Sequence, residues 1–240
     1  MIRRLLFSIL AAAIAASAFA QTAPEPAKPL FYYAGAAGRL TQDRDRQGGN
    51  PFASALVDVL KQKPLTLADF GGRMAAANAR YSGGWHQLQF PKTPPNPKWR
   101  FDAAGEKRVA LVLINADYSK SPGVYSLPGA AFDARRVPKA LVEAGFETLV
   151  VLDKDGEAAR RALADFAELS ERADASLIYV GGHGVQHGRA VYWMMGDYPE
   201  RDEKWLATHA ISLDEIGRAG RARSVNLVLY ASCRDDPFTR

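Results

Sequence analysis

The sequence predicts an α/β fold in which helices cover both faces of a mostly parallel sheet. Four apolar runs have the character of strands buried on both faces, at 108–115, 146–152, 175–180 and 225–231. Segments with helical spacing of apolar residues lie between or beside them, at 130–145, 156–173 and 212–222. Because strands that alternate with amphipathic helices form parallel sheets, this order favours a doubly covered sheet.

The first half of the chain carries further elements. Residues 30–35 are predicted to form a short strand, and Pro51 in the first turn of an apolar-periodic segment indicates a helix over 50–60. A second helix over 66–82 and a strand over 84–90 follow.

Two local signals mark the helices of the second half. Ser212 and Glu215 have capping-box spacing, which predicts a helix start at 212. Pro138 lies inside the helix predicted over 130–145, where its ring removes a backbone hydrogen bond. We therefore expect a kink or a later start in that helix.

The first twenty residues have the organisation of a secretory signal peptide. Two arginines precede an apolar stretch from Leu5 to Ala16, and small residues at 18 and 20 predict cleavage after Ala20. A retained anchor would need about 20 apolar residues without that small-residue exit. We therefore expect a periplasmic or secreted protein, with no membrane association after removal of 1–20 and with a Pro-rich tether over 21–29.

The charge distribution argues against a nucleic-acid partner. The 240-residue chain has a formal net charge of +5, and removal of 1–20 takes away two arginines and no acids, which leaves 29 basic and 26 acidic residues. These charges interleave along helix faces instead of forming a basic patch. The length suits one domain.

One histidine and one cysteine stand at the ends of two predicted strands. Strand 175–180 runs into Gly-Gly-His183-Gly, and strand 225–231 runs into Ser-Cys233. Reacting groups gather at the carboxyl ends of parallel strands, and the tips of neighbouring strands lie about 5 Å apart. If these strands are neighbours, the imidazole and the thiol can meet.

Such a pair can perform nucleophilic catalysis. A histidine can take the proton of a thiol, which then attacks an amide carbonyl and forms a covalent acyl-enzyme. The backbone N–H groups of Gly184 and Cys233 are candidate oxyanion donors. His187, four residues after His183, does not complete a set of metal ligands, and the glycines lack the Lys-Ser/Thr of a phosphate-binding loop. We expect neither a metal nor a cofactor.

The segments around these residues resemble caspase-like and metacaspase-like cysteine peptidases, in particular bacterial members. "LIYVGGHGVQ" resembles the family's strand followed by Gly-His-Gly, and "VNLVLYASCRDDPF" resembles its strand with a Cys-Arg-Asp ending. "RVALVLINADY" and "LPGAAFDARRVPKALVEAGF" resemble the family's first strand and first helix. The resemblance covers 107–238 and implies a three-layer α/β/α sandwich with a mostly parallel six-stranded sheet.

The resemblance also implies roles for single residues. It gives His183 as general base, Cys233 as nucleophile, Gly184 as an oxyanion donor, and a polypeptide as substrate. Asp133 matches an acid of the family's substrate-binding pocket. Members that cleave after Arg or Lys carry a second acid two positions before the nucleophile, where this chain has Ala231, so the specificity stays open.

The segment before residue 107 resembles the part of the family that ordinarily follows the cysteine. Residues 30–90 contain a strand with a Tyr-Ala turn, a polar loop, an Asn-Pro-Phe helix start, a further helix and a last strand. We predict a circular permutation within one domain, 30–240: residues 30–90 supply the last strands, 91–106 form a Pro-rich bridge, and 107–240 carry the His and the Cys. The alternatives are an unrelated prosegment and a helical subdomain. The permutation requires residues 30–35 to lie beside strand 225–231.

Two functions remain open. The first is an exported cysteine endopeptidase that hydrolyses peptide bonds with His183 and Cys233. The second is a catalytically inactive relative that binds a peptide or protein in the same cleft. Ala231 and the vulnerability of a free thiol to oxidation favour the second function.

Overall fold

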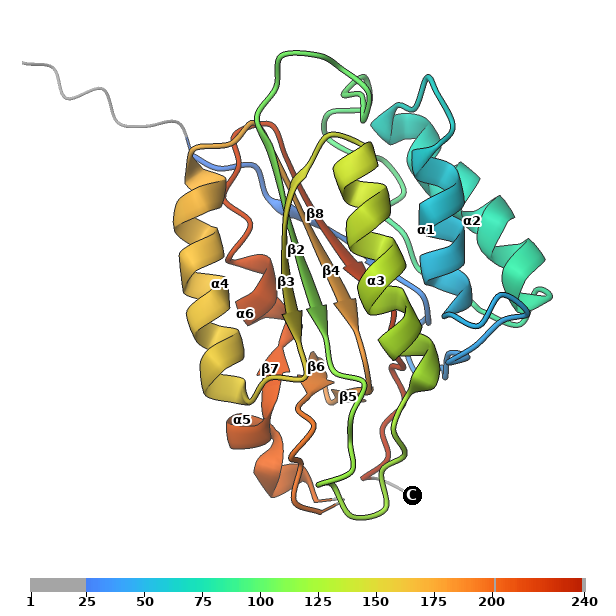
Figure 1. Ribbon diagram of the computed structural model, residues 1–240, viewed down its shortest axis with the longest axis vertical. Coiled ribbons are helices and arrows are strands. Elements are labelled where there is room, and N and C mark those ends of the chain that lie inside the picture. Colours follow the sequence, from blue (N-terminus) through green and yellow to red (C-terminus); the bar gives the residue numbers. More distant parts are fainter. Residues whose placement is uncertain (1–24, 201, 239–240) are drawn as a thin grey trace, which may run out of the picture.

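A computed structural model describes residues 25–200 and 202–238, in which a parallel sheet lies between two layers of helices (Figure 1). The predicted signal peptide, 1–20, lies outside these residues. The described strands are β1 (Pro29–Tyr33), β2 (Arg108–Ile114), β3 (Glu147–Leu152), β4 (Ala175–Gly181), β5 (Gly184–His187), β6 (Ala190–Met194), β7 (Ala210–Ser212) and β8 (Val225–Tyr230). The central sheet has the order β1-β8-β4-β2-β3 with every pair parallel, and β5-β6-β7 form a small antiparallel sheet.

The helices form one layer on each face of the central sheet. They are α1 (Pro51–Leu60), α2 (Leu67–Ser82), α3 (Pro128–Glu143), α4 (Gly156–Glu171), α5 (Leu206–His209) and α6 (Leu213–Gly217), with a 3₁₀ turn at Glu203–Trp205. In β4, Leu177 and Tyr179 pack on the side of α1, α2 and α3, while Ile178 and Val180 pack on the side of α4 and α6. None of the described helices is long and apolar enough to span a membrane.

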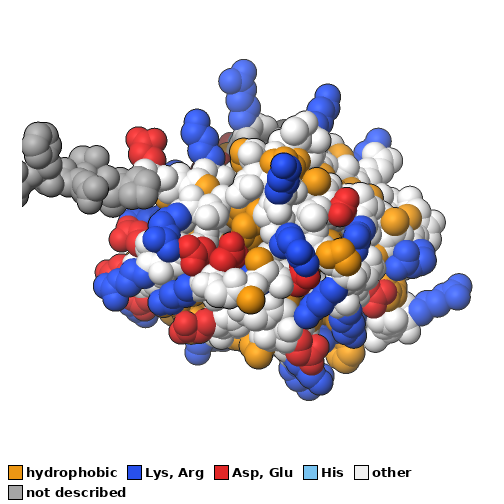
Figure 2. All heavy atoms as spheres, turned by 90° about the horizontal axis from the view of Figure 1, so that it is seen from above, with side chains coloured by type: hydrophobic (Ala, Val, Ile, Leu, Met, Phe, Trp, Pro, Cys, Tyr) orange, Lys and Arg blue, Asp and Glu red, His pale blue; other side chains and the backbone are white. Residues whose placement is uncertain are grey.

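Charged side chains of both signs are mixed over the end of the molecule that is opposite the carboxyl ends of the central strands. Figure 2 views this end, where the amino ends of the strands lie, and shows lysines and arginines interspersed with aspartates and glutamates.

Strand β3 differs from its prediction as a buried strand. Within the described residues it is an edge of the sheet with only β2 beside it, and its side chains Leu149, Val150 and Leu152 are 40%, 47% and 40% exposed. An apolar run predicts a strand but does not say how many neighbours the strand has.

The predicted sixth strand, 84–90, is reduced to a single antiparallel bridge between Tyr33 and Gln89. The backbone N–H of Tyr33 donates to Gln89 O at 2.9 Å, and that of Gln89 donates to Tyr33 O at 3.1 Å. On one side of the bridge a single further backbone bond joins Ala36 N to Gln87 O, and on the other side Pro91 has no N–H to donate. The central sheet of the described chain therefore has five strands.

Strand β1 lies beside β8, as the sequence interpretation requires. The two strands are parallel and in register from Pro29 opposite Asn226 to Tyr33 opposite Tyr230. The predicted tether ends earlier than residue 29, because Ala27 N already donates to Ala222 O at 3.1 Å. Strand β1 thus covers the edge that β8 would otherwise expose.

Helix α3 begins earlier than the sequence predicts, at Pro128, and it contains Pro138. The expected later start is therefore wrong. Leu127, the residue before the helix, makes no side-chain cap. Asp43 caps it from a distant loop instead, since its carboxylate accepts from Gly129 N at 3.0 Å and from Ala130 N at 3.2 Å. This cap ties the loop before α1 to the carboxyl end of the sheet.

Candidate active site

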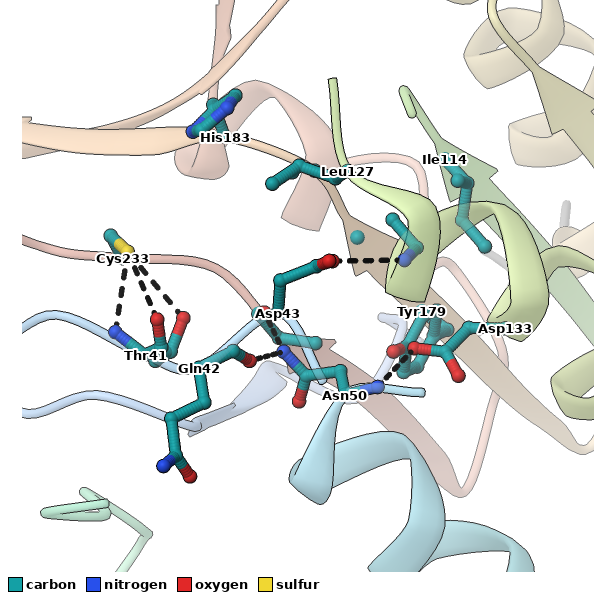
Figure 3. A pocket seen from close by; sticks show the side chains of 14 residues that line it. Thr41, Gln42, Asp43, Asn50, Ile114, Leu127, Asp133, Tyr179, His183 and Cys233 are labelled. Atoms are coloured by element: carbon teal, nitrogen blue, oxygen red, sulfur yellow. Dashed lines mark hydrogen bonds between the residues drawn. The ribbon is translucent and has the colours of Figure 1, made fainter. Parts of the chain in front are cut away.

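His183 and Cys233 line one cavity of about 80 Å³ at the carboxyl ends of the neighbouring strands β4 and β8 (Figure 3). Gly182 turns the chain from β4 toward His183 with φ 138°, and a Cβ at that position would lie 2.8 Å from Asn115 O. The cavity is lined by Thr41, Gln42, Asp43, Asn50, Ile114, Leu127, Ala130, Asp133, Tyr179, Gly181, Gly182, His183, Ala231 and Cys233.

The ring of His183 is fixed by two aromatic residues. Its Nε2 lies 2.7 Å from the carbonyl oxygen of Tyr125, and its ring packs edge-on against Tyr118 with centroids 4.5 Å apart. A carbonyl can only accept, so Nε2 carries the hydrogen and Nδ1 of the neutral ring is an acceptor. Burial lowers the pKa of His183, which favours this neutral, proton-accepting form at pH 7.

The thiol of Cys233 is bound by Thr41. The backbone N–H of Thr41 donates to Sγ at 3.2 Å, and Sγ lies 3.8 Å from Thr41 O. Within the described chain these contacts and the Thr41 hydroxyl are the hydrogen-bond partners of Sγ, so the structure brings His183 and Cys233 into one cavity without a hydrogen bond between them. Burial raises the pKa of the Cys233 thiol, which is therefore protonated at pH 7.

Gly184 begins β5 with its backbone turned toward the cysteine segment. Gln186, two residues later on the same strand, donates its N–H to Asp235 O at 2.9 Å. Because N–H groups two residues apart in a strand point to the same side, the N–H of Gly184 also faces the segment after Cys233. A Cβ at Gly184 would collide with the Tyr230 hydroxyl and lie 2.9 Å from Cys233 O, so only glycine allows this approach.

Asp133 also lines the cavity, and its carboxylate is already paired. Arg136 Nε lies 2.7 Å from Oδ1, and Asn50 N donates to Oδ2 at 3.0 Å. Burial raises the pKa of Asp133 to about 7 although Arg136 acts in the opposite direction. Asp133 therefore lines the cavity that His183 and Cys233 line, but it does not present a free negative charge.

The loop before α1 supplies side chains to the cavity that the sequence interpretation missed. Thr41 and Asp43 belong to this loop, and Asn50 ends it. Asn50 accepts from Phe52 N at 2.8 Å as the N-cap of α1, while its amide donates to Ala231 O at 3.1 Å. A cap was foreseeable from the Asn-Pro-Phe helix start, but Thr41 and Asp43 carry no local signal.

His86 binds the backbone of the same loop. It is 7% exposed, and its Nε2 accepts from Gln42 N at 2.9 Å. Burial lowers the pKa of His86 to about 4, so the ring is neutral at pH 7 and can accept this bond. This hydrogen bond fixes the position of Gln42, the residue that follows Thr41.

No group of three or more His, Cys, Asp or Glu side chains among the described residues is arranged to hold a metal ion. His187, the second histidine after β4, instead contacts two carboxylates: Nδ1 lies 3.1 Å from Asp236 Oδ2, and Nε2 lies 3.1 Å from Glu203 Oε2.

Comparison with known families gives a match over the second half of the chain. The model of the caspase domain, a cysteine peptidase family, matches residues 107–239, more than half of the chain. The chain belongs to the caspase domain family. Its membership indicates a peptidase that acts on polypeptides. No curated protein matches the chain.

The caspase-domain match contains all four predicted site residues, Asp133, His183, Gly184 and Cys233. It does not contain the loop residues Thr41 and Asp43, which line the same cavity. The cavity of this caspase domain is therefore built from the matched segment together with residues far upstream of it.

Proposed function

We propose that this caspase-domain protein is a cysteine endopeptidase in which Cys233 is the nucleophile and His183 is the general base. The observation that carries the proposal is their common cavity at the tips of β4 and β8. The contact of His183 Nε2 with Tyr125 O supports it, since Nδ1 is left as the proton acceptor.

In the first step Sγ of Cys233 attacks the carbonyl carbon of the scissile peptide bond, and the thiol proton passes to Nδ1 of His183. A C–S bond forms, and the carbonyl oxygen becomes an oxyanion that the N–H groups of Gly184 and Cys233 stabilise. The C–N bond then breaks as His183 returns the proton to the leaving amine. Water attacks the thioester with His183 as base, and the carboxylic acid and the free thiol are released.

The resting pair is neutral in this mechanism. Burial raises the pKa of Cys233 and lowers the pKa of His183, and both shifts oppose a thiolate–imidazolium pair. The proton therefore moves during the attack, when the thiol leaves Thr41 and turns toward the imidazole.

The test is cleavage of a mixed peptide library, with the cut sites identified by mass spectrometry. Cys233→Ala and His183→Ala are each expected to lower the cleavage rate by about 100-fold or more. His209→Ala is the control, because His209 does not line the cavity. Peptide binding without cleavage by the intact protein would instead support a binding module, and cleavage that survives Cys233→Ala would contradict the proposed nucleophile.

We also propose that the domain, 30–240, is circularly permuted, with 30–90 as the transposed segment and 91–106 as the bridge. Two observations support this: β1 pairs in parallel with β8, and the match to the caspase domain begins only at residue 107. The prosegment alternative predicts instead that 30–90 can be removed without loss of the fold.

A rearranged gene tests the permutation. The gene would encode residues 107–238 first, then a linker of about 20 Gly/Ser residues, and then the chain from residue 25 onward. Such a linker spans about 25 Å on average. We expect a folded protein with the cleavage pattern of the original chain. A matched chain that lacks residues 25–90 should be insoluble, because β8 then becomes an exposed edge. A soluble and active truncated chain would contradict the permutation.

Export is a separate proposal that concerns residues outside the described structure. The basic start, apolar stretch and Ala20 site favour removal of 1–20 and a periplasmic or secreted protein. The intact mass of protein recovered from the periplasm or medium should correspond to a chain that starts at Gln21. Recovery of the uncleaved chain from the cytoplasm alone would contradict export.

A further inference from the structure

The negative charge of Asp133, at one end of the cavity, is balanced by a positive charge within the protein. Arg136, one helical turn after Asp133 on α3, contacts Asp133 Oδ1 at 2.7 Å through Nε. Its Nη2 also donates to Ser54 Oγ at 2.8 Å, which holds the guanidinium between α3 and α1. Asp133 is 1% exposed, so solvent does little to screen this pair. A positively charged group that entered the cavity would therefore meet an Asp133 carboxylate whose charge is already balanced by Arg136.

The second carboxylate of the cavity, Asp43, is compensated by the start of α3. Its oxygens accept from Gly129 N at 3.0 Å and from Ala130 N at 3.2 Å. A helix start carries about half a positive charge, which offsets much of this carboxylate. Arg44 Nε lies 3.7 Å from the same carboxylate. Neither acid of the cavity therefore presents an unopposed negative charge, as Figure 3 shows for the bonds of Asp43 and Asp133.

Besides the two acids, the reactive pair and the polar residues Thr41, Gln42 and Asn50, the cavity wall has apolar surface and the hydroxyl group of Tyr179. Ile114, Leu127, Ala130 and Ala231 contribute apolar surface. Tyr179 is fully buried, and its hydroxyl group has no hydrogen-bond partner among the described residues. Burying a hydroxyl without a partner is unfavourable, so a ligand group that accepts a hydrogen bond here is stabilised.

We propose that this cavity binds the substrate side chain that precedes the scissile bond, that it selects an uncharged amide side chain, Asn or Gln, and that Arg136 sets this preference. This inference rests on the proposed peptidase function. The amide oxygen accepts from Tyr179, and the amide nitrogen donates to remaining lone pairs on Asp133 or Asp43. A Lys or Arg side chain loses its hydration without gaining a net opposing charge.

The size of the cavity agrees with an amide side chain. A volume of about 80 Å³ corresponds to roughly half a dozen water molecules at 10–15 Å³ each in the same measure. This is comparable to the non-hydrogen atoms of an Asn or Gln side chain. Ala231 and Gly181 contribute to this space, since a Cβ at Gly181 would lie 3.3 Å from Tyr179 Cε1 and from Ile114 Cγ1.

The experiment compares fluorogenic peptides that differ only in the residue before the scissile bond: Asn, Gln, Arg, Lys and Asp. For the wild type we expect kcat/KM for Asn or Gln to exceed that for Arg and Lys by about tenfold or more. Arg136→Gln should move the ratio toward Arg and Lys by a similar factor, because Asp133 loses its compensating charge. Arg135→Gln is the matched control, since Arg135 is the exposed neighbour on the same helix.

Tyr179→Phe is the second variant, and its result does not depend on whether the protein folds with the Arg136→Gln substitution. It removes a hydroxyl group that has no partner within the described chain, so the fold should be unaffected. We expect a rise in KM for Asn and Gln peptides that brings kcat/KM down by about tenfold, with the Arg and Lys values unchanged.

The outcomes separate the two proposals. Cys233-dependent cleavage that prefers Arg or Lys in the wild type would overturn the amide preference while the peptidase function stands. An unchanged ratio in Arg136→Gln, with the amide preference present, would overturn the role of Arg136. Absence of Cys233-dependent cleavage with all five peptides and with the mixed library would overturn the peptidase function and this inference with it.

Discussion

The backbone N–H of Thr41 donates to the sulfur of Cys233 at 3.2 Å, although 192 positions separate the two residues in the sequence. This bond places the loop before α1 directly on the candidate nucleophile. Burial of the thiol, which this loop contributes to, raises the pKa of Cys233. The hydrogen bonds from Thr41 act in the opposite direction and lower this pKa, so a segment outside the caspase-domain match contributes to the reactivity of the cysteine.

Alkylation of Cys233 by iodoacetamide should titrate at a higher pH in the folded protein than for an ordinary thiol, whose pKa is about 8.5. The thiolate is the reacting form, and burial disfavours it. The measurement is the alkylation rate from pH 6 to 10, with the same chain unfolded in urea as the reference. A folded-state midpoint at or below that of the unfolded chain would contradict a protonated resting thiol.

Acid should weaken the fold through His86. An unfolded histidine titrates near pH 6.5, whereas burial lowers the pKa of His86 to about 4. The unfolded chain therefore binds the proton first, and stability is lost as the pH falls from 6.5 to 4, by about 3 kcal/mol from this residue. Urea unfolding at several pH values measures the loss. His86→Gln, which keeps an acceptor for Gln42, should reduce the slope.

Gly129→Ala should displace the loop that carries Asp43. The added methyl group would lie 2.0 Å from Asp43 O, which is closer than atoms can approach. We expect a loss of about 1–3 kcal/mol in the free energy of unfolding, together with a loss of peptidase activity. Gly72→Ala on α2 is the matched control, because a Cβ there meets nothing within 4 Å and should stabilise the helix by up to about 1 kcal/mol. Equal effects of the two substitutions would contradict the contact.

Asn50→Ala should affect both stability and activity. It removes the N-cap of α1, a loss of about 1 kcal/mol, and it also breaks the bond from Asn50 Nδ2 to Ala231 O. Thr66→Ala removes the corresponding cap of α2, which lies away from the cavity. Asn50→Ala should lose more unfolding free energy than Thr66→Ala, measured in urea, because it also leaves Ala231 O without this buried partner, and only Asn50→Ala should lower kcat/KM. Equal activities would mean that Asn50 acts only as a cap.

Most of the fold could be predicted from the sequence because its elements are defined by local pattern. Strand β4 is an unbroken apolar run, and α4 has regular amphipathic spacing with Asp155 as its cap. The exposure of β3 could not be predicted, because it depends on the absence of a further neighbour. The structure of residues 84–90 likewise depends on how the chain reaches β1, where Gln89 forms a bridge with Tyr33 and Phe90 packs against Tyr32.

Part of the candidate site could also be predicted from local sequence pattern. His183 and Cys233 directly follow strands, so sheet topology alone brings their positions together. The Arg136 partner of Asp133 could have been anticipated from three-residue spacing on one helix. Thr41 and Asp43 could not, because their place follows from the path of an irregular loop and from the helix start that it meets.

The pairing of β1 with β8 gives the chain a high contact order around its reactive centre. Residues 29–33 find their partner strand only after residue 230 has been synthesised. Closing so long a loop has an entropic cost and slows folding. Until that closure, the thiol of Cys233 lacks its contact with Thr41, and the cavity lacks the wall that the loop before α1 contributes. The cavity is therefore completed only at a late stage of folding, after the two ends of the described chain have met.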